Sequence, residues 1–107
     1  MAARVIPKKL EILDNSTYNY CDALNKDDII SNSGNWTSST CVLGTFLNAG
    51  LFNGKGEKYL AFRFNTNSNY KYGWIKIYCS NHNDTLRIID YAYNDVENSE
   101  IKAGQID

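Results

Sequence analysis

The sequence contains few of the residues that most often carry catalysis, with one histidine and three cysteines among its 107 residues. A base-assisted serine or cysteine mechanism needs a nucleophile, a base and an orienting group in one place, and only His82 is available as the imidazole base. The three cysteines and His82 also lack the short ligand spacings that zinc sites show. We therefore predict that the protein is not an enzyme and holds no zinc.

The sequence also lacks an excess of charge and a long apolar run. Its formal net charge is −1 and its lysines and arginines are scattered, so it has no basic stripe of the kind that binds nucleic-acid phosphates. The longest apolar stretch, residues 41–47, is broken by Gly44 and Thr45 and is far shorter than the roughly 20 residues that cross a bilayer. The sequence predicts no nucleic-acid partner and no transmembrane segment.

Proline is nearly absent, whereas asparagine is abundant. The single proline, Pro7, stands before the first expected strand, where its missing N–H costs no ladder hydrogen bond. Most of the 14 asparagines lie between apolar runs, where the side chain can bond to nearby backbone and tolerates left-handed conformations. The sequence shows no internal repeat and no linker that would separate two domains. We expect a single domain, residues 1–107, with frequent turns.

Period-two alternation of apolar and polar residues marks several strands. We expect strands at residues 8–13, 58–65, 70–80 and 85–93, with a hairpin loop at 65–69, so that the carboxy-terminal half forms a three-stranded meander. Residues 41–51 fit a short helix or a buried strand, and we favour the strand. Residues 31–40 read as a loop pinned by Trp36. The predicted fold is all-β: a small antiparallel β-sandwich, or a barrel-like form of one.

Three cysteines allow at most one intramolecular disulfide. Cys21 and Cys41 both lie in polar, turn-flanked surroundings, and we predict that they pair. Closing that loop would contribute about 3 kcal/mol in the chain-entropy model. Cys79 continues the apolar face of a strand, so we expect it to be a buried thiol.

The strand expected at 70–80 is apolar on both faces. One face carries Lys76 and four rings, and these rings are the candidate ligand-binding residues: Tyr70, Tyr72, Trp74 and Tyr78. If the opposite, aliphatic face is the core, the rings, with Arg63 and Arg87 as neighbours, form an exposed surface that stacks sugars or docks a protein. If another segment covers them, they are core residues. We favour the second interpretation, because a strand apolar on both faces most often lies deep in a sandwich.

Four fragments in the second half of the chain follow one another at hairpin spacings: Tyr59-Leu60-Ala61-Phe62-Arg63-Phe64, Tyr72-Gly73-Trp74-Ile75-Lys76, Asp90-Tyr91-Ala92-Tyr93-Asn94 and Ile101-Lys102-Ala103-Gly104. In this order they resemble the end of small secreted or lipid-anchored β-sandwich domains of Gram-negative bacteria, found in Bacteroidetes and among PEP-CTERM-type exported proteins. The resemblance implies a compact β-sandwich that is extracellular, at the cell surface or periplasmic in its mature form after export. It brings no known active site.

Three functional hypotheses follow. The first is a non-enzymatic secreted or cell-surface module with a structural or binding role. The second is a carbohydrate-binding module that uses the ring face of residues 70–78. The third is a self-associating subunit of an extracellular assembly, in which residues 2–13 are exchanged between neighbours. We expect no cofactor, with calcium as a lesser alternative because Asp14, Asp27, Asp28 and Asp84 are oxygen donors in expected loops.

Overall fold

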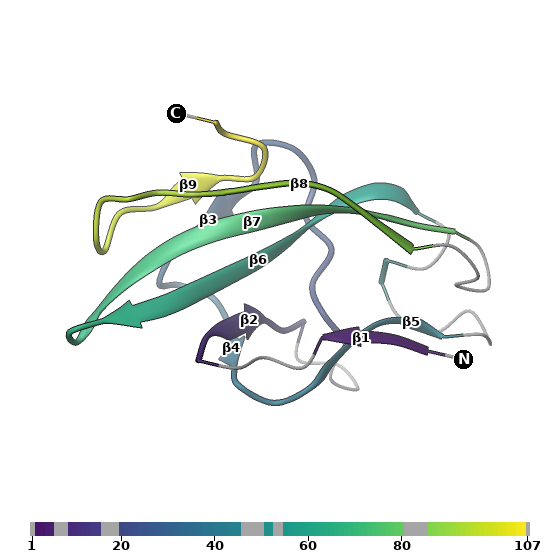
Figure 1. Ribbon diagram of the computed structural model, residues 1–107, viewed down its shortest axis with the longest axis horizontal. Coiled ribbons are helices and arrows are strands. Elements are labelled where there is room, and N and C mark those ends of the chain that lie inside the picture. The colour runs from purple at the N-terminus through teal and green to yellow at the C-terminus, as the bar shows by residue number, and fades with distance from the viewer. Residues whose placement is uncertain are drawn as a thin grey trace.

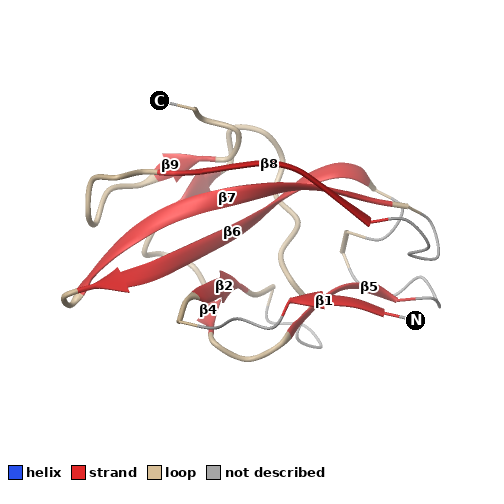
Figure 2. Cartoon of the chain, viewed as in Figure 1, coloured by secondary structure: helices blue, strands red, loops and turns tan. Residues whose placement is uncertain are grey.

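The computed structural model describes residues 2–5, 9–15, 20–45, 51–52, 55–80 and 86–106. All regular structure in this part of the chain is β (Figures 1 and 2). The strands are β1 (Ala2–Val5), β2 (Glu11–Leu13), β3 (Ile29–Ile30), β4 (Trp36–Thr37), β5 (Cys41–Thr45), β6 (Gly56–Thr66), β7 (Asn69–Cys79), β8 (Leu86–Tyr93) and β9 (Ile101–Lys102). The all-β fold class is confirmed. No helix in the described ranges is long and apolar enough to cross a membrane.

The main sheet has five strands in the order β4-β2-β6-β7-β8, and its pairs are antiparallel. Two smaller antiparallel pairs, β1-β5 and β3-β9, complete the described fold, and none of these sheets closes on itself. The predicted meander is confirmed as β6, β7 and β8. Its first turn consists of Asn67 and Ser68 with φ angles of 52° and 74°. Positive φ at both residues of a two-residue loop suits the right-handed twist of the paired strands.

The central β6–β7 hairpin is buried on both faces. One face contributes to a first core cluster: Ile12, Cys21, Leu43, Phe52, Leu60, Phe62, Ile77 and Cys79. The other face contributes to a second core cluster: Leu13, Leu24, Ile30, Tyr59, Ala61, Tyr72, Trp74, Ile101 and Ala103. In Figure 1 the β1–β5 pair lies below the hairpin and β9 lies above it. This layering is that of a sandwich, because the main sheet has cover on each face.

Several short elements were not predicted. β1, β3, β4 and β9 have between two and four residues, too few for a periodic pattern to emerge. The strand expected at 8–13 is observed as β2, Glu11–Leu13. The first half of the apolar run 41–51 is β5, as favoured, and residues 46–50 lie outside the described part of the chain.

The predicted disulfide between Cys21 and Cys41 is wrong in this structure. Cys21 is a buried thiol in the first core cluster, and it does not take part in a disulfide. Its backbone bridges Asp14, whereas Cys41 lies in β5 opposite Val5 of β1. Although its neighbours in the sequence are polar, Cys21 packs in a cluster of apolar residues that includes Leu43 and Phe52. Cys79 is a fully buried thiol, as predicted.

Candidate functional site

The four rings predicted to share one face of the strand lie in different environments in the structure. Tyr72 and Trp74 are each 2% exposed, so they are core residues and do not lie on an exposed stacking surface. The Trp74 indole meets the Tyr59 ring edge to face at 5.3 Å, and its Nε1–H donates to the Gln105 carbonyl at 3.0 Å. The carboxy-terminal segment thus covers this part of β7, as the core interpretation expected.

The other two rings lie at opposite ends of β7. Tyr78 is half-buried, with the Arg87 guanidinium 4.9 Å from its ring. Tyr70 is half-buried at the hairpin end, eight residues away, which corresponds to roughly 26 Å along a strand. No single ligand-stacking surface therefore joins the four predicted residues. Tyr70 belongs instead to a polar site that the sequence did not reveal as such.

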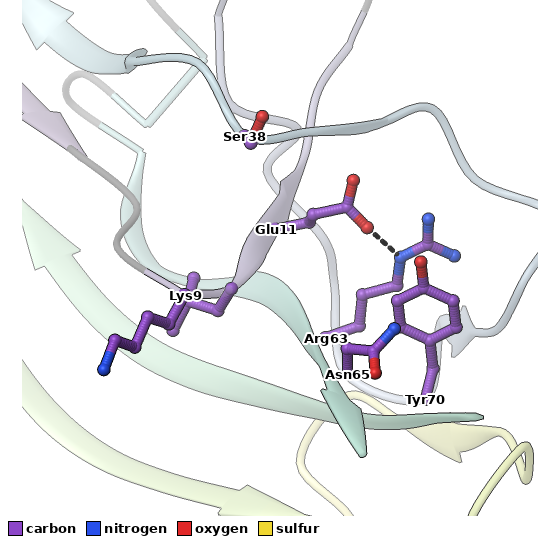
Figure 3. A pocket seen from close by; sticks show the side chains of 7 residues that line it. Lys9, Glu11, Ser38, Arg63, Asn65 and Tyr70 are labelled. Atoms are coloured by element: carbon purple, nitrogen blue, oxygen red, sulfur yellow. Dashed lines mark hydrogen bonds and ion pairs between the residues drawn. The ribbon is translucent and has the colours of Figure 1, made fainter. Parts of the chain in front are cut away.

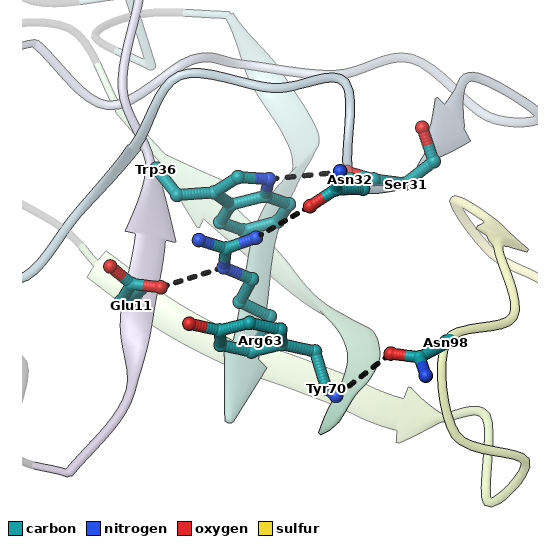
Figure 4. A network of polar contacts seen from close by, with 7 residues as sticks. All are labelled: Glu11, Ser31, Asn32, Trp36, Arg63, Tyr70 and Asn98. Carbon is teal, nitrogen blue, oxygen red and sulfur yellow. Dashed lines mark hydrogen bonds and ion pairs between the residues drawn. The ribbon is translucent and has the colours of Figure 1, made fainter. Parts of the chain in front are cut away.

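That site is built around Arg63 of β6 (Figure 4). The Arg63 Nε–H donates to the Glu11 carboxylate at 2.7 Å, and an Nη1–H donates to Asn32 Oδ1 at 3.2 Å. The guanidinium lies between two rings, 4.0 Å from the Tyr70 centroid and 5.0 Å from that of Trp36. The Arg63 side chain is only 12% exposed. A cation at this depth requires both an anion and hydrogen-bond partners.

The sheet places these partners by register. Glu11 of β2 stands directly opposite Arg63 of β6, so their side chains share one face of the sheet. On the other side of β6, Tyr70 is opposite Asn65, two residues from Arg63 and within reach of its side chain. Trp36 comes from β4, beyond β2, and its Nε1–H donates to the Ser31 carbonyl at 3.1 Å. Four strands hold the cation in one orientation.

The backbone of Tyr70 is fixed from outside the sheet. Its N–H donates to Asn98 Oδ1 at 3.1 Å, and its carbonyl accepts the Asn98 N–H at 2.7 Å. Asn98 has a φ of 59°, a conformation that asparagine tolerates better than most residues. The loop after β8 thereby clamps the end of the β6–β7 hairpin, which holds the Tyr70 ring against Arg63.

A cavity of about 310 Å³ opens beside this cluster. Figure 3 shows Lys9 and Tyr70 on opposite sides of it, with Glu11 and Arg63 joined along one wall. Its lining offers hydrogen-bond donors, acceptors and one ring: Lys9, Leu10, Glu11, Ser38, Arg63, Asn65 and Tyr70. Lys9 has a φ of 63°, an uncommon conformation for a side chain of this size. We call these seven residues the Arg63 pocket.

A second cavity of about 340 Å³ includes Asp14 and Asp22 in its lining. Burial raises the pKa of Asp22, and repulsion from Asp28 and Asp14 raises it further, while the Ala23 N–H opposes the shift. Among the described residues, no group of three histidine, cysteine or acidic side chains is placed to hold a metal ion. Asp84 and His82 lie outside those residues. The calcium alternative therefore gains no support.

Comparison with known proteins adds no relative. No family model, no curated protein and no solved structure matches the chain. The resemblance to exported Gram-negative domains stays a prediction.

One signal in the sequence points to the Arg63 pocket. The alternation in β6 puts Arg63 on the same face as Tyr59 and Ala61, and a cation on a buried face needs a partner. The sequence does not identify Glu11 or Trp36 as that partner.

Proposed function

We propose that this protein is a non-enzymatic module, exported to the cell surface or periplasm, that binds a small hydroxylated ligand such as a sugar unit in the Arg63 pocket. The observation that supports this most is the fixed cation beside an open cavity. Arg63 is held by Glu11, Asn32, Trp36 and Tyr70. A side chain already restrained in this way loses little conformational entropy when a ligand arrives.

The lining of the pocket favours a sugar over an apolar ligand. Ser38 supplies a hydroxyl, Glu11 supplies acceptors, and Asn65 supplies both donors and acceptors. Hydroxyl groups pair with donors and acceptors alike, and the Tyr70 ring provides an apolar surface beside them. A volume of about 310 Å³ lies at the lower end of small-ligand pockets. One or two sugar units would fill it.

Export is proposed from the sequence resemblance alone. The two described thiols do not oppose it, because Cys21 and Cys79 are each 0% exposed and burial keeps a thiol from oxidants. The hypothesis of strand exchange by residues 2–13 is less favoured, since β1 pairs with β5 and β2 pairs with β4 and β6 of the same chain. If the module binds no ligand, its role is wholly structural, which is the other form of the first hypothesis.

The binding proposal is tested by titrating the ¹⁵N-labelled protein with neutral monosaccharides, disaccharides and uronic acids. We expect saturable amide shifts at Lys9, Ser38, Asn65 and Tyr70. Ser38→Trp, which fills the cavity from an exposed position, should abolish them. Tyr91→Ala removes an exposed ring on a different strand and should leave them unchanged.

Two results would overturn the proposal. One is the absence of saturable shifts for every sugar in the panel. The other is a set of shifts that survives Ser38→Trp but not Tyr91→Ala, which would move the binding surface to β8. Circular dichroism of each variant shows that the fold is retained.

A further inference from the structure

The edge of the main sheet at β8 differs from the rest of the surface. β8 is the last strand in the order, so within the described part of the chain nothing pairs with its outer side. The Asn94 N–H donates inward to the Tyr72 carbonyl. Because backbone groups alternate along a strand, those of Tyr91 and Tyr93 point outward. The opposite edge, β4, has only two residues, whereas β8 has eight.

β8 also exposes an apolar stripe. Leu86, Ile88, Tyr91 and Tyr93 are 45%, 70%, 67% and 48% exposed. They stand opposite Cys79, Ile77, Ile75 and Gly73 of β7, which places them on the face of the first core cluster. Edge strands of soluble proteins are usually protected by lysine, proline or inward-pointing charge. β8 has neither lysine nor proline, and its charged residues are Arg87 and Asp90.

A bulge makes this strand complementary to itself. Ile88 pairs with Ile77 and Asp90 with Lys76, so Ile89 is an extra residue in β8. The extra residue lets Arg87 and Asp90, three apart, point to the same face of the sheet. A two-fold axis between Ile88 and Ile89 would then bring each Arg87 opposite Asp90 of a second strand. In a strand without a bulge, this register would oppose side chains from different faces.

We propose that β8 docks a second copy of this chain, antiparallel and across that two-fold axis, to form a continuous sheet through both molecules. Two Arg87–Asp90 pairs lie on one face, and Leu86 meets Tyr91 of the other copy on the apolar face. In the single chain, the Asp90 carboxylate accepts the outward Tyr91 N–H at 2.8 Å. On pairing, Asp90 turns to the arginine of the second copy, and the Tyr91 N–H bonds to a carbonyl of the second strand.

The size of this contact sets the expected affinity. The two-fold register pairs residues 86–91 of β8 with the same residues of the second copy, a ladder of six residues that is roughly 20 Å long. A single strand edge of this length buries less than the roughly 800 Å² per partner of a standard stable interface. We therefore expect a weak and reversible dimer, with a Kd on the order of 10–100 µM. The inference does not depend on the Arg63 pocket, whose lining includes no residue of β8.

Charge reversal tests the register directly by sedimentation velocity over about 5 to about 500 µM protein. The mass of the natural chain should rise from one copy toward two. Arg87→Glu alone and Asp90→Lys alone each create two like-charge pairs and should weaken association about ten- to thirtyfold. An equimolar mixture of these two variants restores opposite charges at both contacts and should form a one-to-one heterodimer. The double variant should again form a homodimer.

Lys55→Glu, a charge reversal at an exposed site outside β8, is the matched control and should leave association unchanged. A natural chain that keeps the mass of one copy at every concentration overturns the proposal. So does a dimer that neither single reversal weakens, or single variants that lose association and do not regain it on mixing. Two unfolded variants would not form a heterodimer when they are mixed. Recovery of association on mixing therefore excludes loss of fold as the cause of the single-variant effects.

Discussion

At the scale of single residues, the site depends on how Arg63 is compensated. A guanidinium at 12% side-chain exposure has lost most of its hydration and is stable only with its partners in place. Glu11 provides the charge, Asn32 a second hydrogen bond, and two rings cover its faces. Cation–π contacts of this kind contribute about 0.5–2 kcal/mol each.

A double-mutant cycle measures this compensation. Glu11→Gln leaves the cation with a weaker acceptor and should lower the free energy of unfolding by about 1–3 kcal/mol. Arg63→Met keeps the aliphatic stem between the rings and leaves Glu11, which is 29% exposed, to water. In the Arg63→Met background, the Glu11→Gln change should therefore cost less than about 0.5 kcal/mol. Urea unfolding of all four proteins gives the coupling, and equal costs in both backgrounds would show that the pair is not coupled.

The environment of Asp22 affects the stability of the folded protein in a way that depends on pH. Burial and the nearby Asp28 and Asp14 raise its pKa, so the folded protein holds a proton on Asp22 more readily than the unfolded chain. The unfolded carboxyl titrates near its ordinary pKa of 3.8. Between that pH and the folded pKa the folded state binds more protons, so stability declines as the pH rises. Above the folded pKa the penalty is complete.

Asp22→Asn should therefore stabilise the protein at pH 7, because it removes the buried charge and keeps an acceptor for the Ala23 N–H. The advantage over the natural chain should shrink as the pH falls and disappear below pH 3.8. Urea unfolding at a series of pH values measures the difference. An advantage that does not change with pH would mean that Asp22 titration is not its cause.

At the scale of elements, the close contact between β7 and its neighbours depends on Gly73. A Cβ at this position would lie 2.5 Å from the Ala92 carbonyl oxygen and 2.5 Å from Cζ of Phe62. The first is backbone of β8 and cannot swing aside, and the second belongs to a ring that is 8% exposed. Gly73 thus lets β8 approach β7 where the meander is most crowded.

Gly73→Ala should lower the free energy of unfolding by about 1–3 kcal/mol, the usual cost of overpacking. Amide exchange should increase most in β8, because the added methyl pushes against Ala92. The matched control is Gly56→Ala, where nothing lies within 4 Å of the added Cβ and only the φ of 73° opposes the change. An effect at Gly73 no larger than at Gly56, with unchanged exchange in β8, would exclude the steric explanation.

At the scale of the whole molecule, one long hairpin organises the fold. β6 and β7 contribute side chains to both core clusters, and the Cα radius of gyration is 13.1 Å, as expected for a compact chain of this length. Both faces are covered at the hairpin, while β8 extends beyond the cover with its apolar stripe exposed. The two proposals follow from this arrangement: a pocket at the β2 side of the sheet and a docking edge at the β8 side.

The sequence by itself determined what depends on near neighbours in the chain. The alternation in residues 58–65, 70–80 and 85–93 and the expected hairpin loop at 65–69 were sufficient for the meander and the all-β class, because strand period and turn composition are local properties. Burial of Cys79 also followed from the alternation. β1, β3, β4 and β9 were too short to leave such a pattern.

Only the tertiary structure decided which segments cover the two faces of β7. That choice buried Trp74 and Tyr72, left Tyr70 beside a cavity, and kept Cys21 as a thiol in the core. It also joined Arg63 to Glu11, 52 residues earlier in the chain. The physical reason is that an apolar face must be covered and a buried cation must be paired, but the local sequence does not specify which of several distant segments does so. The packing of the whole chain selects one.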